Sequence, residues 1–381
     1  MGVVSVLTFS YFGSIFLDLN QRLEASGITV YSSQGEPFEE LIYRNIDGPL
    51  NILVIGSDTR QNQGGNYGDH EGELADVVIL LHVSEDRKNA AALSFPRDLM
   101  ISVPECPNPA GGDNYPARDL MQINATLSTG GPACTLLAVQ QLTGLDIPHL
   151  AMIDFKGVIA MTNEVGGVEV CVANDINDKY SKLYLEAGEH TLQGEEALAF
   201  LRTRHGVGDG SDLSRISNQQ VYLTSLVRKL KDEGTLTNPF RMFALANAAV
   251  DNMTLSNGLA NLTTIISMAR ELNDVELDNI TFIRLPVYDM KGDYAGRVGV
   301  QVEQATELFA RLQADEPLVL AEANPGSGAV VAEPSAQPTK SPGPTATDDV
   351  AIDPSQPAVD ATPALPDWVL GTTASTKTCS N

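Results

Sequence analysis

Short apolar runs of strand length recur along the chain and are separated by residues that favour turns. Strands are expected at 52–56, 76–83, 89–95, 149–153, 167–173 and 280–286. Apolar residues with helical spacing predict helices at 133–142, 194–201, 211–230, 256–272 and 303–314, with another helix that begins at Asn238-Pro239. Alternating strands and helices over roughly 270 residues predict one layered α/β domain. We expect this domain to span 50–320.

The first residues of the chain differ from the rest. Residues 1–17 carry no charged side chain and meet Asp18, and such a run is at the lower limit for a helix that crosses a bilayer. It has neither a basic preceding region nor an A-x-A cleavage site, so a cleaved signal peptide fits poorly. We therefore expect a transmembrane anchor at 1–17 whose basic flank lies outside this sequence; a buried core helix is the alternative. Residues 18–49 are then a stalk or lead-in, and everything after the anchor is extracytoplasmic.

The composition changes again beyond Leu320. Residues 325–366 hold nine of the 21 prolines, and such a segment cannot bury enough apolar surface to offset the entropy lost on ordering. A disordered Pro/Ala-rich linker is predicted at 321–366. The final segment, 367–381, contains the only tryptophan, Trp368, and a cysteine, Cys379. We expect it to return and dock on the domain, with a frayed terminus as the alternative.

The chain is strongly acidic: 49 acidic residues stand against 24 basic ones, giving a net charge of −25. This balance excludes a general nucleic-acid binder, because neutralising phosphates requires clustered Lys and Arg. It also excludes attachment to anionic lipid by charge alone. Any phosphate chemistry must therefore depend on a few placed arginines.

Charged residues gather where predicted strands end. Asp58 and Arg60 follow the strand at 52–56, Arg97 and Asp98 follow the strand at 89–95, and Asp76 begins the strand between them. In open α/β sheets, ligands bind beyond the carboxyl ends of strands. These residues are therefore candidates for one binding site.

A third polar cluster surrounds the long helix predicted at 211–230. Arg202 and Arg204 would project to one side if their segment is extended, and Arg215 and Gln219 are four residues apart on one helix face. Guanidinium groups bind phosphate through paired hydrogen bonds, so arginines gathered in an acidic protein suit a diphosphate. Each arginine alone could be a solvated ion pair that contributes little. The joint pattern favours the diphosphate.

These stretches resemble the LytR-CpsA-Psr family of bacterial cell-wall glycopolymer transferases. The resemblance covers most of the α/β domain in the family's order, through ILVIGSDTR, ADVVILLHV, LSFPRDL, INATLSTGGP, MIDFKGVIAMTNEVGGVEV and LQGEEALAFLRTRHGVGDGSDLSRISNQQ. The acidic composition and the cysteines are similar to actinobacterial members. The family fold implies a mixed central sheet flanked by helices, with an apolar groove for a lipid.

The resemblance implies transfer of a glycopolymer from a polyprenyl-diphosphate lipid to the muramic acid 6-hydroxyl of peptidoglycan, which forms a phosphodiester outside the membrane. Asp58 and Asp76 would hold Mg²⁺, since this ion commonly takes one or two carboxylates together with phosphate oxygens. The resemblance assigns the diphosphate to Arg97, Gln122, Arg202, Arg204, Arg215 and Gln219, and a supporting role to Arg60, Asp98 and Asp212. Catalysis would rest on Asp58, Asp76, Arg97, Arg204 and Arg215, because phosphoryl transfer depends mainly on positioning and charge stabilisation. The general base could be Asp58 or another carboxylate.

Three positions depart from the family pattern. Leu74 and Asn218 stand where the family often has Arg, and Gln122 stands where it usually has Lys. Each change removes a positive charge, and one lost transition-state donor can cost roughly 10²–10³ in rate. A membrane-anchored lipid-diphosphate binder or regulator with little turnover therefore remains open. A pyrophosphatase on the same lipids also remains open, since water can replace the acceptor hydroxyl once the diphosphate is bound.

Four cysteines lie far apart without a C-x-x-C pair, which excludes zinc-ribbon and thioredoxin motifs. An even number fits two disulfides in an exported chain and four thiols otherwise. Because Cys106 and Cys134 flank a long loop near the expected site, we hypothesise that they are paired, which would stabilise the fold by about 3–4 kcal/mol. Cys171 would then pair with Cys379 and tie the tail to the domain.

Overall fold

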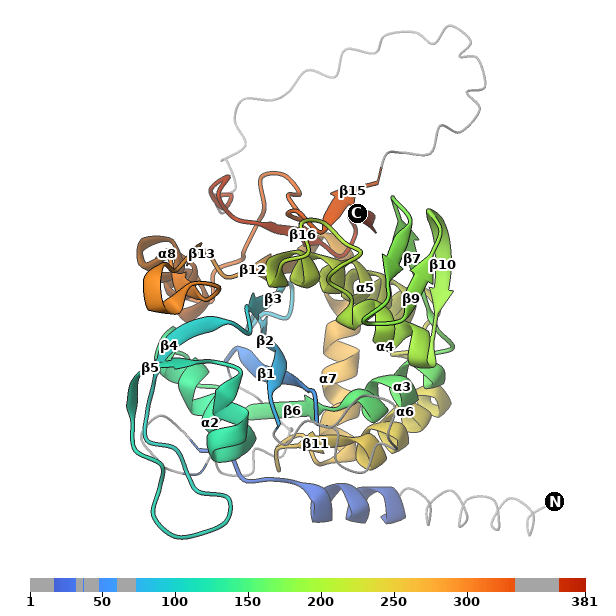
Figure 1. Cartoon of the computed structure of the whole chain (residues 1–381). Helices are drawn as coiled ribbons and strands as arrows, with labels where there is room; N and C mark the ends of the chain where they lie inside the picture. The colour runs from blue at the N-terminus through green and yellow to red at the C-terminus, as the bar shows by residue number, and fades with distance from the viewer. Residues whose placement is uncertain (1–16, 32–36, 38–47, 60–72, 333–362) are drawn as a thin grey trace, which may run out of the picture.

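Figure 1 shows a computed structural model of the chain, which describes residues 17–31, 37, 48–59, 73–332 and 363–381. A seven-stranded sheet of order β11-β6-β1-β2-β3-β12-β16 lies at its centre. The strands are β1 Leu50–Ser57, β2 Ala75–Val83, β3 Ala90–Phe95, β6 His149–Ile153, β11 Met253–Leu255, β12 Ile280–Arg284 and β16 Gly371–Thr373. β2 is antiparallel to β1 and β3, whereas β6 and β12 run parallel to those neighbours. The expected mixed sheet is therefore confirmed.

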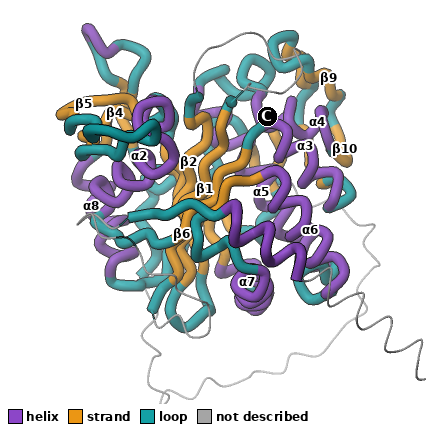
Figure 2. Tube along the Cα trace, turned by 90° about the horizontal axis from the view of Figure 1, so that it is seen from below, coloured by secondary structure: helices purple, strands orange, loops and turns teal. Residues whose placement is uncertain are grey.

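Helices cover both faces of this sheet, as Figure 2 shows with α2 and α8 on one side and α5, α6 and α7 on the other. The helices are α2 Ala125–Thr143, α3 Phe155–Glu164, α4 Gly194–Arg202, α5 Asp212–Asp232, α6 Pro239–Asn252, α7 Leu262–Asp274 and α8 Val302–Gln313. The pleat of β1 explains the two cores, because alternate side chains point to opposite faces. Leu53 and Ile55 pack in the core that includes α2 and α8. Leu50 and Ile52 pack in the core on the other face.

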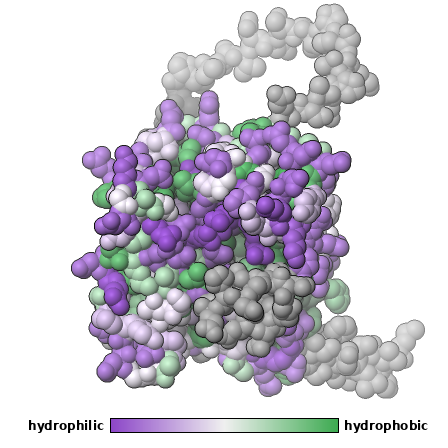
Figure 3. Space-filling view, viewed as in Figure 1, coloured by the Kyte–Doolittle hydropathy of each residue, from purple (hydrophilic) through white to green (hydrophobic). Residues whose placement is uncertain are grey.

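Smaller sheets flank the central one. They have the orders β10-β7-β17-β15, β13-β14-β4-β5 and β8-β9. Their strands are β4 Leu99–Val103, β5 Arg118–Gln122, β7 Val168–Val172, β8 Ile176–Asp178, β9 Leu183–Leu185, β10 Gly188–Leu192, β13 Val287–Asp289, β14 Val298–Val300, β15 Ala329–Val331 and β17 Thr378–Ser380. The face in Figure 3 is mostly hydrophilic, in keeping with the charge.

Both hypothesised disulfides are present in the structure. Cys106 is bonded to Cys134 across a Cα–Cα distance of 5.1 Å. Cys171 of β7 is bonded to Cys379 of β17, with which it is also in register, across 4.4 Å. The tail therefore docks on the domain as expected, and β16 of the same tail extends the central sheet.

Two segments assigned from composition differ in their described parts. Residue 17, the last of the expected anchor, and residues 18–26 of the lead-in form a helix. Leu19 and Leu23 on one face of that helix are fully buried, so this part of the lead-in is packed on the domain. In the linker, residues 329–331 form β15 and pair with β17, because the alanine-valine run there suits a strand. Residues 1–16 and 333–362, where the anchor and most of the linker were expected, lie outside the described residues. Within the described ranges, no helix has both the length and the apolar character to span a membrane.

Two helices begin elsewhere than the apolar pattern indicates. α7 begins at Leu262, because 253–255 pair with β6 and the side chain of Asn261 caps the helix by accepting from the backbone of Thr263 and Thr264. α2 begins at Ala125 and is kinked at Gly130 and Gly131, just before Pro132. Gly131 has a φ of 68°, a left-handed conformation that glycine adopts without steric cost.

Candidate functional site

The ends of β1 and β2 bring two candidate carboxylates to one edge of the sheet. Ser57 pairs with Ala75, and beyond this pair Asp58 N donates to Leu74 O at 3.1 Å. Leu74 N in turn donates to Asp58 Oδ1 at 2.8 Å. Asp58 therefore leaves β1 at the same edge where Asp76 enters β2.

Two arginines converge on Asp76. Arg97 follows β3 and places Nη1 at 2.6 Å from Asp76 Oδ1. Arg215, in the first turns of α5, donates from Nη2 to the Asp76 main-chain oxygen at 3.0 Å, and its Nη1 lies 3.9 Å from Asp76 Oδ1. Strand ends and a helix start, far apart in sequence, thus meet at one carboxylate.

Asp212 forms ion pairs with the same two arginines. Its Oδ1 lies 2.5 Å from Arg215 Nη2 and 3.4 Å from Arg97 Nε. It is placed there because Ser211 caps α5 by accepting from Ser214 N, so that Asp212 falls in the first turn. We call Asp76, Arg97, Asp212 and Arg215 the arginine cluster.

The arginine cluster is buried but its hydrogen bonding is incomplete. The side chains of Arg97 and Arg215 are only 21% and 5% exposed. Within the described part of the chain, neither Arg97 Nε nor Arg215 Nε has a hydrogen-bond partner. A buried guanidinium donor without an acceptor costs free energy. The Asp212 oxygens Oδ1 and Oδ2 also lack a hydrogen bond among the described residues, so the cluster is joined by ion pairs and its hydrogen bonds are incomplete on both sides.

Burial and neighbouring charges shift the pKa values of Asp76, Arg97 and Arg215. Burial raises the pKa of Asp76, but the charges of Arg215 and Arg97 outweigh it and lower this pKa below its usual value. Burial lowers the pKa of Arg97, but Asp76 outweighs it and raises this pKa. Burial dominates at Arg215 and lowers its pKa, although Asp212 opposes the shift.

Arg202 and Arg204 border this cluster, but not on an extended segment as the sequence suggested. Arg202 is the last residue of α4, one residue beyond the helix predicted at 194–201, and Arg204 follows in the loop. The Arg202 guanidinium lies 4.4 Å from the centre of the Phe155 ring, a favourable cation–π distance. The charge of Arg202 contributes to the lowered pKa of Asp76, and that of Arg204 to the lowered pKa of Arg215.

Asp178, which sequence reasoning missed, holds the loop that carries Arg204. Its Oδ2 accepts from Thr203 Oγ1 at 2.7 Å, Arg204 N at 3.2 Å and His205 N at 3.3 Å. Burial raises the pKa of Asp178, but the hydrogen bonds from Thr203 Oγ1 and from the backbone of Tyr180, Arg204 and Ser181 outweigh this effect and lower the pKa to about 2. An isolated aspartate 25 residues before its partner carries no sequence signal.

The remaining predicted residues make contacts within the protein. Asp98 Oδ1 accepts from Gln122 Nε2 at 2.6 Å and from Arg297 Nη1 at 2.7 Å; sequence reasoning also missed Arg297. Asp98 Oδ2 lies 3.7 Å from Arg97 Nε. Asp98 therefore links Gln122 and Arg297 to the arginine cluster through Arg97.

The side-chain amides of Asn218 and Gln219 on α5 bind the backbone of α4. Gln219 Nε2 donates to Leu201 O at 2.9 Å, and Asn218 Nδ2 donates to Phe200 O at 2.7 Å. Gln219 therefore does not share a ligand with Arg215 in this conformation; it fixes the end of α4. Arg60 lies outside the described residues.

The carboxylates at the sheet edge fit a magnesium ion in part. Among the described residues, no three His, Cys, Asp or Glu side chains are grouped for a metal. Mg²⁺ does not require such a group, because it commonly takes one or two carboxylates and completes its coordination with waters and phosphate oxygens. Asp58 and Asp76 supply oxygen donors of the right kind at one edge, so they fit an ion that arrives with a phosphate substrate.

Comparison with known proteins identifies the family of the chain. The LytR_cpsA_psr family profile matches residues 15–314. The chain belongs to the LytR-CpsA-Psr family. A cell wall biosynthesis protein LcpA of Corynebacterium glutamicum is 33% identical over 291 residues, which are 69% of this chain and 55% of that protein.

Two further family members carry enzyme names. A polyisoprenyl-teichoic acid–peptidoglycan teichoic acid transferase TagT of Bacillus subtilis is 28% identical over 188 residues, 48% of this chain and 53% of that one. A solved LytR-Csp2A-Psr enzyme from Actinomyces oris superposes with a TM-score of 0.52 at 25% identity, covering 70% of this chain and 94% of that one. The chain spans about half the length of the curated relatives.

Proposed function

We propose that this protein transfers a glycopolymer from a polyprenyl-diphosphate carrier to the muramic acid 6-hydroxyl of peptidoglycan, forming a phosphodiester. The observation that carries the proposal is the convergence of two largely buried guanidinium groups, those of Arg97 and Arg215, at the Asp76 edge of the sheet. A diphosphate supplies acceptor oxygens for both. The similarity to teichoic acid transferases of the family supports the type of reaction. The two arginines at Asp76 support the edge of the central sheet as the place where the reaction occurs.

In the proposed reaction, the acceptor hydroxyl oxygen forms a bond to the phosphorus that carries the sugar. The bond from this phosphorus to the bridging oxygen breaks, and polyprenyl phosphate leaves. Arg97 and Arg215 bind the charge that develops on the phosphoryl oxygens, while Asp212 and Asp98 hold the two guanidinium groups in place. The hydroxyl proton passes to a carboxylate, for which Asp58 at the sheet edge is the candidate.

Mg²⁺ would be held by Asp58 and Asp76 and would neutralise charge on the diphosphate. Although burial raises the pKa of Asp76, the charges of Arg215 and Arg97 lower it, so its carboxylate stays ionised. The proposal also places the domain outside the cytoplasmic membrane, tethered by an anchor, and the two disulfides support an oxidising compartment. We also propose that the polyprenyl chain binds in an apolar groove, which the family resemblance implies.

The test uses purified protein, a sugar-bearing prenyl diphosphate and a peptidoglycan fragment. Arg97→Ala should abolish the linked product, whereas Arg241→Ala, which removes an exposed arginine that pairs with Glu233, should leave it unchanged. Lipid binding without linked product or released phosphate would instead establish a binding protein. Phosphate release without acceptor would establish a pyrophosphatase.

A further inference from the structure

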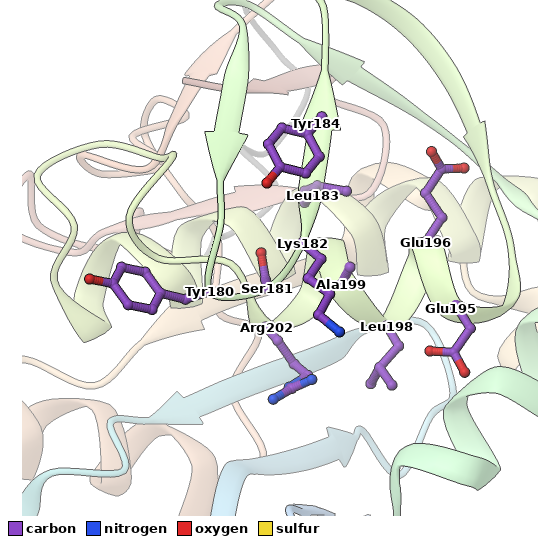
Figure 4. A pocket seen from close by; sticks show the side chains of 10 residues that line it. All are labelled: Tyr180, Ser181, Lys182, Leu183, Tyr184, Glu195, Glu196, Leu198, Ala199 and Arg202. Atoms are coloured by element: carbon purple, nitrogen blue, oxygen red, sulfur yellow. The ribbon is translucent and has the colours of Figure 1, made fainter. Parts of the chain in front are cut away.

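The end of α4 is bound by side chains from α5, and Arg202 is the residue at that end. Arg202 lines a cavity of about 560 Å³ between the β8–β9 hairpin and α4 (Figure 4). The last carbonyl groups of a helix have no partner within it and need donors from elsewhere. In α4, Phe200 O accepts from Asn218 Nδ2 at 2.7 Å. The next carbonyl, Leu201 O, accepts from Gln219 Nε2 at 2.9 Å.

The side chain of Asn218 also contacts the C-terminal segment of the chain. Its Oδ1 accepts from Ser380 Oγ at 2.5 Å, and both residues are completely buried. Ser380 is held in β17, where its carbonyl accepts from Ala173 N at 2.7 Å. An amide suits this place because it donates and accepts, whereas a Lys or Arg side chain only donates. Since Ser380 occupies Oδ1, the amide presents its NH₂ group to α4.

Asn218 thus connects two helices that each carry an arginine of the site. Arg215 lies three residues before Asn218 on α5, and Arg202 is two residues beyond Phe200 on α4. The charges of Arg215 and Arg202 both act on Asp76 at the sheet edge. A diphosphate has two phosphoryl groups, and each can take paired hydrogen bonds from one guanidinium group. The separation of the two arginines therefore determines whether both phosphoryl groups are bound at once.

We propose that Asn218 is a positioning residue for the diphosphate site. Its amide, oriented by Ser380, sets the separation of the Arg202 and Arg215 guanidinium groups to match one diphosphate. The inference rests on the proposed function for the ligand that these arginines bind. It adds that the C-terminal segment contributes to the site through a hydroxyl group that acts on α4 and α5 alone.

A role in stability alone would have a different effect on binding. A variant that only destabilises the fold lowers the amount of folded protein, and it weakens the binding of every ligand of the site alike. A change in the separation of two arginines weakens a diphosphate, which needs both of them. It leaves a monophosphate, which needs one, as it was. The ratio of the two Kd values therefore distinguishes positioning from stability.

The experiment measures by calorimetry how the full chain, with both disulfides intact, binds geranyl diphosphate and geranyl monophosphate. Asn218→Leu keeps the size of the side chain and removes both of its hydrogen bonds. Ser380→Ala removes only the hydroxyl group of the C-terminal segment, and it keeps the proposal testable if Asn218→Leu does not fold. Asn252→Leu is the matched control, because Asn252 Nδ2 also donates to a helix carbonyl, that of Ala248 on α6, at 2.8 Å.

We expect Asn218→Leu to raise the Kd of the diphosphate about tenfold and Ser380→Ala about threefold, through loss of buried hydrogen bonds. The Kd of the monophosphate and both Kd values of the control should stay unchanged. The double variant should bind no more weakly than Asn218→Leu, because Ser380 acts through Asn218. Equal weakening of the two ligands, additive losses, or unchanged diphosphate binding in both variants would each refute the positioning role.

Failure of this inference can be told apart from failure of the proposed function. Diphosphate binding that depends on Asn218 and Ser380, without any transfer product, would refute the proposed function and leave the positioning role standing. A parent protein that binds the diphosphate no more tightly than the monophosphate would refute the positioning role. Formation of the linked product by that same protein would leave the proposed function standing.

Discussion

Thr203 Oγ1 donates a hydrogen bond of 2.7 Å to Asp178, and both residues are buried. This contact fixes the turn between α4 and the loop of Arg204, and the same carboxylate accepts from Tyr180 N on the hairpin. Asp178 therefore determines how the loop that carries Arg204 lies against the turn between β8 and β9, which carries Tyr180. Removing the Asp178 carboxylate should therefore change both the affinity for the ligand and the free energy of unfolding.

We expect Asp178→Ala to lower the free energy of unfolding by about 1.5–3 kcal/mol, since hydrogen bonds to a charged group are lost and buried donors remain unpaired. The Kd for a prenyl diphosphate should rise, because Arg204 is no longer held. Urea unfolding and calorimetry measure the two effects. Asp289→Asn, an exposed position on β13, is the control and should change neither. Unchanged affinity in a destabilised Asp178→Ala protein would show that the contact serves the fold alone.

Asp178 also predicts a pH dependence. Its folded pKa of about 2 lies below its ordinary value of 3.8. A group with a lowered folded pKa stabilises the protein above the unfolded pKa, and this stabilisation is lost as the pH falls through the folded value. The difference in unfolding free energy between the parent and Asp178→Asn should therefore be full at pH 7 and shrink from about pH 4 toward pH 2. A difference that stays constant over this range would contradict the assigned role.

The central strands and the arginine cluster could be predicted from the sequence, and the contacts that hold the cluster could not. The apolar runs around Ile55 and Leu80 predict buried strands, and charged residues at their ends predict a site. Asp178, Arg297 and the fold of Arg202 into α4 depend on tertiary contacts between distant segments. Periodicity contains no information on such pairings. The helix predicted at 194–201 is confirmed and extends by one residue to Arg202, because its end is set by contacts that the spacing of apolar residues does not show.

Arg97 and Arg215 should act as a coupled pair. Both contact Asp76 and Asp212, so removing either arginine leaves carboxylates that are only partly compensated. We expect each single change to Lys, which keeps the charge but loses the planar fork, to lower kcat by roughly 10²–10³. The double variant should lose less than the product of the two effects. Steady-state rates of the four proteins measure the coupling, and fully additive losses would show that the arginines bind separate groups.

The disulfide between Cys171 and Cys379 should contribute strongly to stability, because it closes a loop with a sequence separation of 208 residues. In the chain-entropy model such a long loop corresponds to about 5 kcal/mol. We expect the paired change of both cysteines to serine to lower the unfolding midpoint in urea, and reductant to do the same to the parent protein. Reductant should have a smaller effect on the serine variant, in which only Cys106–Cys134 remains. Equal sensitivity of the two proteins would assign the stabilisation to the other disulfide.

Gln122 tests whether a missing positive charge limits the site. Its Nε2 donates to Asp98 Oδ1 at 2.6 Å, and Asp98 in turn lies beside Arg97 Nε. Gln122→Lys introduces the residue that the family usually has at this position. We expect the lysine to bind both Asp98 and a diphosphate oxygen, and to lower the Kd for a prenyl diphosphate about tenfold, the effect of one charge-assisted hydrogen bond of ~1.5 kcal/mol. Gln122→Met is the control of similar size without charge and should weaken binding. If Lys and Met have the same effect, the charge at 122 does not reach the bound diphosphate, and the arginine cluster alone determines the affinity.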